Sequence, residues 1–137
     1  MCIRDRVLNI GKLKSGFVEE VKDEIEQIKA VVSPLPLKVI MEVVLLTDEE
    51  IVMAARIIRD AGASFAKTGT GWAGATTEHH IEVIKAAVGD MIPLKVAGGV
   101  RSLDTLLKMR DMGVSRFGIG YKSALHIMQE AEERGWV

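Results

Sequence analysis

Short apolar runs alternate along the chain with longer segments in which apolar residues recur every three or four positions. The runs are typical of buried strands, and the longer pattern is typical of amphipathic helices. The expected strands cover residues 7–10, 37–46, 64–67, 92–97 and 115–119. The expected helices cover residues 17–32, 48–61, 77–88, 102–112 and 123–134. The pattern therefore predicts strand-helix units that follow one another along the whole chain.

Local signals mark the ends of these elements. Thr47 and Glu50 have the spacing of a capping box at the start of the second helix. A glycine closes three of the helices, at Gly62, Gly89 and Gly113. Residues 11–16 are expected to form a loop after the first strand. Lys38 and Glu42 are four positions apart in the second apolar run, so we expect them to share one face of its strand.

The alternation of strands and helices predicts a parallel α/β sheet, because each helix is long enough to cross back over it. Two architectures have this order, an open doubly wound sheet and a (β/α)8 barrel. Residues suited to binding or chemistry follow the strands at their carboxyl ends, namely Lys67, Lys95, Gly98, Gly99, Gly118 and Gly120. Barrels build their sites at that end of the strands. This placement favours the barrel.

The composition is that of a single globular domain: 137 residues, 48% hydrophobic and 27% charged, so disorder is not expected. A formal net charge of −1 gives no general attraction to nucleic acid or to an anionic membrane. No apolar run reaches the roughly 18 residues of a membrane span. Cys2 is the only cysteine, which excludes an internal disulfide and indicates a reducing, cytoplasmic location.

Residues 1–6 do not fit the pattern. Arg4, Asp5 and Arg6 place three charges directly before an expected buried strand, and no apolar stretch of a secretory signal follows them. We therefore divide the chain into an anomalous start at residues 1–6 and a domain at residues 7–137.

Lys67 ends an apolar run and is followed at once by a loop of threonine and glycine, and Lys95 has the same position in another run. A lone lysine at a strand end usually reaches water. Two such lysines on neighbouring strands oppose each other's protonation in a partly desolvated pocket. A neutral lysine is a nucleophile that forms a Schiff base with a carbonyl group. The alternative is structural, with each lysine paired to an acid such as Glu42.

Glycines also precede the last two expected helices. They lie in Gly98-Gly99-Val100-Arg101-Ser102 and in Gly118-Ile119-Gly120. Such glycines leave backbone N–H groups free at helix N-termini, where phosphate binds well. Because the last two βα loops form the phosphate site of many TIM barrels, the two groups together with Arg101 indicate a phosphate site.

Other motifs carry less information. His79 and His80 lie in the first turn of a helix without a cysteine or acid at ligand spacing, so we expect a solvated pair and no metal site. The sequence also lacks the dinucleotide-binding, Walker-type and nucleophile-elbow patterns.

The lysine and glycine segments resemble the DeoC family of class I aldolases, the deoxyribose-phosphate aldolases. The resemblance runs from Val7 to at least Ser123. Its segments are residues 7–16, 38–42, 45–50, 61–68, 74–76 and 95–101. Because they occur in order and at suitable spacing over nearly the whole chain, the match is specific.

The resemblance implies a TIM barrel that reversibly cleaves 2-deoxy-D-ribose 5-phosphate to D-glyceraldehyde 3-phosphate and acetaldehyde, without a metal or organic cofactor. Lys67 matches the Schiff-base lysine and Lys95 the second lysine that keeps it neutral. Asp5 matches an aspartate that relays protons with a water. The implied substrate and phosphate positions are Lys38, Thr68, Gly71, Gly98, Gly99, Val100, Arg101, Gly118 and Gly120. A sugar phosphate is the expected partner, and nucleic acid and membrane are not expected.

The chain departs from the family pattern at three points. Gly69 stands where the family often has serine, and Gly120-Tyr121 stands where many members have two serines that hold the phosphate. The chain is also shorter than the roughly 200 residues of a barrel. Its strands would be the fourth to eighth. We therefore expect an incomplete TIM (β/α)8 barrel of about five βα units, with exposed sheet edges that favour pairing with a second copy.

Three functions remain open at this point. The chain is an aldolase piece that keeps most site residues and has little activity in isolation, a non-catalytic α/β module that binds phosphate, or a different class I aldolase on the same fold.

Overall fold

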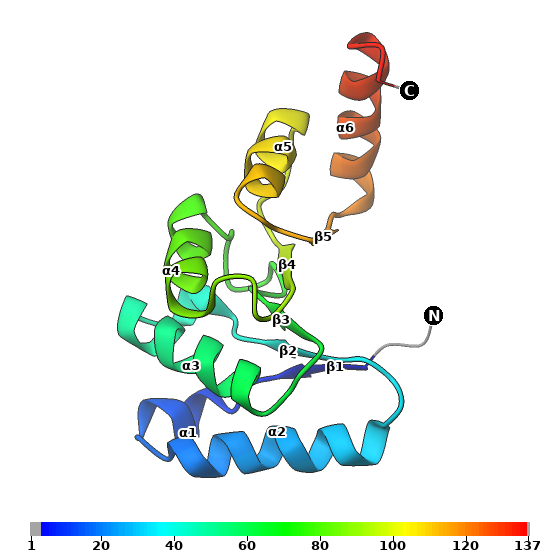
Figure 1. Cartoon of the computed structure of the whole chain (residues 1–137). Helices are drawn as coiled ribbons and strands as arrows, with labels where there is room; N and C mark the ends of the chain where they lie inside the picture. Colours follow the sequence, from blue (N-terminus) through cyan, green and yellow to red (C-terminus); the bar gives the residue numbers. More distant parts are fainter. Residues whose placement is uncertain (1–3, 137) are drawn as a thin grey trace.

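The computed structural model describes residues 4–136, which form one parallel sheet with helices packed along it (Figure 1). The strands are β1 (Arg4–Val7), β2 (Leu37–Ile40), β3 (Phe65–Lys67), β4 (Leu94–Ala97) and β5 (Arg116–Gly118). The helices are α1 (Ile10–Lys14), α2 (Val18–Val32), α3 (Asp48–Asp60), α4 (Glu78–Val88), α5 (Leu103–Asp111) and α6 (Tyr121–Glu133). A 3₁₀ turn, η1 (Val43–Leu45), follows β2.

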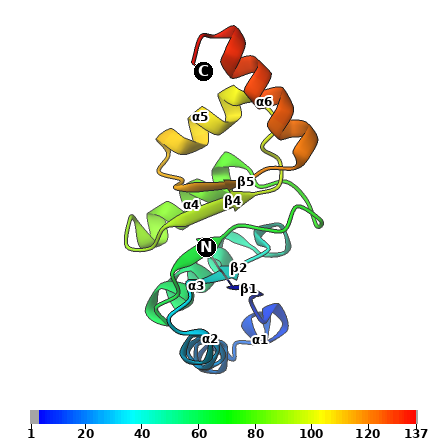
Figure 2. The same ribbon diagram turned by 90° about the vertical axis from the view of Figure 1, so that its right-hand side faces the viewer.

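The strand order decides between the two architectures expected from the sequence. The strands are neighbours in the order β1-β2-β3-β4-β5, and every neighbouring pair is parallel. A doubly wound sheet reverses its strand order part-way, whereas a barrel keeps the order of the chain. In both views α1 and α2 lie at the end of the strand series that begins with β1, and α5 and α6 lie at the end that finishes with β5 (Figures 1 and 2). The described residues therefore form part of a TIM-type barrel, as predicted.

Alternate residues of the strands pack against the helices and form the core. These residues are Leu37, Val39, Ala66, Leu94 and Val96. Each is at most 1% exposed, as are the helix residues Ile25, Ile58 and Ile84 in the same core. Because successive strand residues point to opposite faces, the remaining strand positions lie on the face away from this core.

The first strand begins earlier than the sequence analysis predicted. It covers Arg4–Val7 instead of residues 7–10, and much of the expected loop is helix α1, which the Asn9 side chain caps. The charges suit β1 because it is an edge strand of the described sheet, and Arg6 bonds to Glu24 on α2. Residues 1–3 of the predicted anomalous start, including Cys2, lie outside the described residues.

The second strand ends earlier than predicted. It stops at Ile40, and Glu42 has a φ of 42°, a left-handed conformation outside the range of regular strands. The turn η1 then replaces the rest of the expected strand. Glu42 and Lys38 therefore do not share a strand face, contrary to the sequence-based expectation.

The helix boundaries follow their local signals more closely. The capping box is present, because the Glu50 N–H donates to Thr47 Oγ1 at 3.3 Å and the Thr47 N–H donates to Glu50 Oε2 at 2.9 Å. Helix α6 begins at Tyr121, slightly before the predicted start at residue 123.

Two valines offer a matched test of the core. Val39 is 0% exposed in β2, and Val31 is 85% exposed on α2. Val39→Ala is expected to lower the free energy of unfolding by about 2 kcal/mol, because it removes buried methyl groups and leaves a cavity. Val31→Ala is expected to change it by less than about 0.5 kcal/mol. Urea unfolding measures both, and equal effects would contradict this assignment of the core.

Candidate active site

Strand register brings the predicted lysines to one face of the sheet. Lys67 in β3 is the Cα partner of Lys95 in β4, and Asp5 in β1 is the Cα partner of Lys38 in β2. Register partners on neighbouring strands point to the same side. Lys38 is also in register with Phe65, two residues before Lys67. Both pairs therefore lie on the same face, away from the hydrophobic core.

The carboxylate of Asp5 joins two of these lysines. Lys67 Nζ donates a hydrogen bond to Asp5 Oδ2 at 3.0 Å, and Lys38 Nζ lies 3.7 Å from Asp5 Oδ1. The side chain of Lys38 is only 2% exposed, that of Lys67 is 13% exposed, and that of Asp5 is 34% exposed. Lys67 thus has an acidic partner, but this acid is Asp5 and not Glu42.

The surrounding charges change the pKa of Asp5. Burial alone raises the pKa of this carboxyl group, but the hydrogen bond and charge of Lys67, together with the charges of Lys38 and Lys95, outweigh burial. The pKa of Asp5 is therefore lower than its ordinary value. Asp5 is a carboxylate at neutral pH and can accept a proton from a neighbouring group.

The surroundings of Lys38 lower the pKa of its ammonium group below its ordinary value. Burial lowers the pKa of Lys38, the carboxylate of Asp5 raises it in part, and the positive charges of Lys95 and Arg116 lower it further. Its ammonium group lies 5.3 Å from the centre of the Phe65 ring, and the Arg116 guanidinium lies 4.8 Å from the same ring. The face has more cations than Asp5 alone can neutralise, which favours an anionic substrate.

A cavity of about 330 Å³ lies at the carboxyl ends of β3, β4 and β5. It is lined by Thr70, Gly71, Trp72, Gly98, Gly99, Val100, Arg101, Gly118, Gly120 and Ser123. Lys95 adjoins this cavity, since a Cβ added at Gly118 would lie 3.4 Å from Lys95 Cε. The lysine cluster and the glycine cavity are therefore neighbours.

The cavity depends on two glycines that pack against another loop. Gly98 has a φ of 88°, and a Cβ added there would lie 2.9 Å from the Cα of Gly71. Gly99 has a φ of 90°, and a Cβ there would lie 2.8 Å from the Cβ of Ala75. Both positions thus exclude a side chain by conformation and by space. The bare backbone and Arg101 give the cavity the groups that bind a phosphate.

The structure brings most of the predicted site residues together, with one exception. The predicted positions that line the cavity are Gly71, Gly98, Gly99, Val100, Arg101, Gly118 and Gly120. Lys38 lies in the cluster around Asp5. Thr68 is 0% exposed, and its hydroxyl lies 2.7 Å from the Thr76 hydroxyl and accepts the Ala97 N–H at 3.2 Å. Its side chain supports the loop from inside and does not line the cavity.

Sequence reasoning missed other residues at the site. Thr70, Trp72 and Ser123 line the cavity. The first two follow Lys67 in the same loop, and Ser123 lies in the first turn of α6, so their positions after strands were a usable signal. Glu42 also contacts this loop through Thr70, and no local pattern in the sequence indicates that role.

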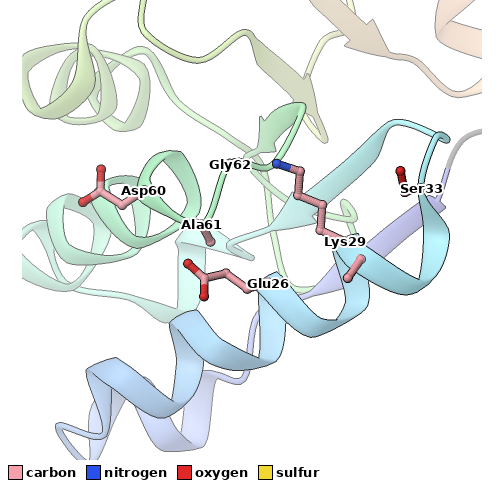
Figure 3. A pocket seen from close by; sticks show the side chains of 7 residues that line it. Glu26, Lys29, Ser33, Asp60, Ala61 and Gly62 are labelled. Carbon is pink, nitrogen blue, oxygen red and sulfur yellow. The ribbon is translucent and has the colours of Figure 1, made fainter.

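A larger cavity of about 470 Å³ lies between α2 and the end of α3, near the amino ends of β2 and β3. It is lined by Glu26, Lys29, Ala30, Ser33, Asp60, Ala61 and Gly62 (Figure 3). The Lys29 side chain reaches toward Gly62 at the end of α3, where a cation is favourable beside the helix C-terminus. These residues precede the amino ends of β2 and β3, so the cavity is separate from the lysine cluster.

The two adjacent histidines make ordinary surface contacts. His79 Nε2 lies 2.8 Å from Asp48 Oδ2, and His80 Nδ1 accepts the Thr77 N–H at 3.0 Å. Within residues 4–136, no group of three or more His, Cys, Asp or Glu residues is arranged to hold a metal ion. In the same part of the chain, no helix is both long and apolar enough to cross a membrane.

The low pKa of Asp5 predicts a pH dependence of stability. The unfolded chain binds a proton at Asp5 before the folded chain does, so the stabilising effect is present above about pH 4 and is lost at lower pH. Asp5→Asn is expected to lower the free energy of unfolding at pH 7 by up to about 1 kcal/mol, because the pair is partly exposed. At pH 2.5 the difference from wild type is expected to shrink. Urea unfolding at both pH values measures it, and a difference that grows in acid would contradict the ion pairs.

The sequence profile of the DeoC/LacD family aldolase matches residues 5–129. The deoxyribose-phosphate aldolase of Sinorhizobium medicae is 43% identical over 127 residues, which are 92% of this chain and 51% of the relative. That of Staphylococcus haemolyticus is 43% identical over 129 residues, which are 93% of this chain and 58% of the relative. The chain therefore spans between half and three fifths of the length of these relatives.

Solved structures show the same likeness. The structure named QR15, an aldolase, superposes with a TM-score of 0.87 at 35% identity, over 96% of this chain and 59% of that one. A tetrameric deoxyribose phosphate aldolase from Aeropyrum pernix has the same fold, with a TM-score of 0.74 at 22% identity, over 85% of this chain and 51% of that one. From its profile match and its sequence identity to these relatives, the chain belongs to the DeoC/LacD family of aldolases.

Proposed function

We propose that this chain carries the Schiff-base and phosphate-binding residues of a deoxyribose-phosphate aldolase. The reaction is the reversible cleavage of 2-deoxy-D-ribose 5-phosphate to D-glyceraldehyde 3-phosphate and acetaldehyde. The main support is the register that places Lys67 beside Lys95 and in contact with Asp5. The glycine cavity that adjoins Lys95 supports the phosphate-bearing substrate.

In the proposed reaction the neutral amine of Lys67 attacks C1 of the open-chain sugar, and loss of one water with uptake of one proton from solvent gives a protonated Schiff base. This cation accepts the electron pair of the bond between C2 and C3, which breaks as the C3 hydroxyl gives up its proton. D-glyceraldehyde 3-phosphate leaves, and two carbons stay on Lys67 as an enamine. Protonation at C2 and addition of water then release acetaldehyde and restore the free lysine.

The neighbouring groups have separate roles in this proposal. Lys95 faces Lys67 from the neighbouring strand and assists the nucleophile from there. Asp5, at 3.0 Å from Lys67 Nζ, takes up and returns protons as the Schiff base and the enamine form. Lys67 and, less strongly, Lys38 keep Asp5 ionised, and Lys38 Nζ lies 3.7 Å from its carboxylate. Gly98, Gly99 and Arg101 hold the phosphate.

We propose that the partner is a sugar phosphate and that the strands are the fourth to eighth of a barrel. Phosphorylated sugars are charged and do not cross membranes unaided, so the proposed compartment is the cytoplasm. Exposed Tyr121, Leu125 and Met128 share one face of α6 by their spacing, which supports pairing with a second copy.

Schiff-base trapping tests the proposal directly. The chain is incubated with 2-deoxyribose 5-phosphate and borohydride, and the adduct is located by intact mass and peptide mapping. An adduct on Lys67 is expected, because that amine is the nucleophile. Lys67→Arg, whose guanidinium forms no Schiff base, is expected to give none. An adduct spread over surface lysines would contradict the proposal. Protection of the fold by sugar phosphates without any adduct would instead favour the non-catalytic phosphate-binding module.

The neighbouring lysine gives a second test of the same chemistry. Lys95→Met is expected to slow trapping at Lys67 by at least about tenfold at pH 7, because it removes the second lysine that faces the nucleophile across the strand pair. The control is Lys108→Met on α5, which removes an exposed lysine and is expected to leave the rate unchanged. Quenched-flow trapping with mass spectrometry measures the rates. Equal rates for all three chains would show that Lys95 does not activate Lys67.

A further inference from the structure

Glu42 has an unusual backbone conformation beside the proposed site. With φ 42° and ψ 61°, it is the non-glycine residue with positive φ among the described residues. Such a conformation costs free energy for a residue with a side chain and persists where the surroundings enforce it. The peptide groups on both sides are fixed, because the Met41 N–H donates to the Lys67 carbonyl at 2.9 Å and the Val43 N–H donates to the Thr68 carbonyl at 2.8 Å.

The side chain of Glu42 is buried and bound to the next loop. Glu42 is 7% exposed, and its carboxylate accepts the Thr70 hydroxyl at 2.5 Å and the Thr70 N–H at 3.3 Å. The Thr70 hydroxyl in turn accepts the Trp72 N–H at 3.2 Å. One carboxylate thus holds the start of the loop that follows Lys67, because buried carboxylates require such donors.

That loop forms one wall of the glycine cavity. Thr70, Gly71 and Trp72 line the cavity, whereas Glu42 does not. Gly71 packs so closely against Gly98 that a Cβ on Gly98 would lie 2.9 Å from its Cα. A shift of Thr70 would therefore change the position of Gly71 and the shape of the wall. A carboxylate inside the cavity would repel a phosphate. The Glu42 carboxylate lies outside the cavity lining and is bound by the Thr70 hydroxyl and N–H.

We propose that Glu42 is a positioning residue for phosphate recognition, and that it acts through Thr70 on the wall of the cavity. This inference rests on the phosphate site proposed above. In this arrangement the left-handed backbone of Glu42 directs its carboxylate from the end of β2 toward Thr70 in the loop after β3. Glu42 touches neither the substrate nor Lys67 in the proposed reaction.

The test measures phosphate affinity and stability separately. Inorganic phosphate is titrated into the full chain while the amide signals of Gly71 and Gly98 are followed by NMR, and urea unfolding gives the stability of each variant. The variants are Glu42→Gln, Thr70→Val and the double variant. Glu42→Gly removes the carboxylate without backbone strain, because glycine adopts positive φ freely. Glu82→Gln, on an exposed position of α4, is the matched control.

Glu42→Gln, Glu42→Gly and Thr70→Val are each expected to weaken phosphate binding about fivefold or more while the chains stay folded. The double variant is expected to bind phosphate no more weakly than the single variant with the lower phosphate affinity. The reason is that both changes weaken the same contact between Glu42 and Thr70. Glu82→Gln is expected to bind as wild type does.

Three results would overturn the inference. One is wild-type affinity in Glu42→Gly, another is additive losses in the double variant, and the third is a wild-type chain that binds no phosphate. The aldolase proposal has a separate readout, the Lys67 adduct. If phosphate binding depends on Glu42 but no Lys67 adduct forms, the aldolase proposal fails and the positioning role of Glu42 stands. If the adduct forms but phosphate binding does not depend on Glu42, the aldolase proposal stands and the positioning role fails.

Discussion

The in-register pairing of parallel strands determines where the groups of the site lie. Because β3 and β4 place Lys67 opposite Lys95, two ammonium groups share one side of the sheet. The same alternation sends Ala66 and Val96 into the core beneath the helices. One register therefore produces an apolar face that stabilises the fold and a charged face that carries the residues of the proposed chemistry. A slip of one residue would exchange the two faces.

The charged face and the glycine cavity form one region because they share the ends of the same strands. Lys95 lies on the sheet face, and its side chain passes close to Gly118 at the rim of the cavity. A glycine at position 118 leaves room for that side chain. The arrangement would thus let the lysines contact one end of an extended substrate while backbone groups of the cavity bind a charged group at its other end. Rigid strand ends fix the separation between the two functions.

What the sequence could predict depended on how local the signal was. The capping box of Thr47 and Glu50 lies within four consecutive residues, and the structure contains it. Lys67 and Lys95 could be singled out as candidates because a charge at the end of an apolar run is visible in the chain. Strand β1 was placed too late, because its charges are explained only by distant partners such as Glu24. The contact of Glu42 with Thr70 gave no local signal, since the two residues are 28 positions apart.

Strand β1 has a further consequence for the site because it carries Asp5. Within the described residues it is four residues long, lies at the edge of the sheet and pairs with β2 alone. Short edge strands open in local fluctuations that need far less free energy than unfolding of the whole domain. An opening of β1 would withdraw Asp5, the shared counter-ion, from both Lys67 and Lys38. The electrostatic state of the site is thus coupled to the local stability of one strand.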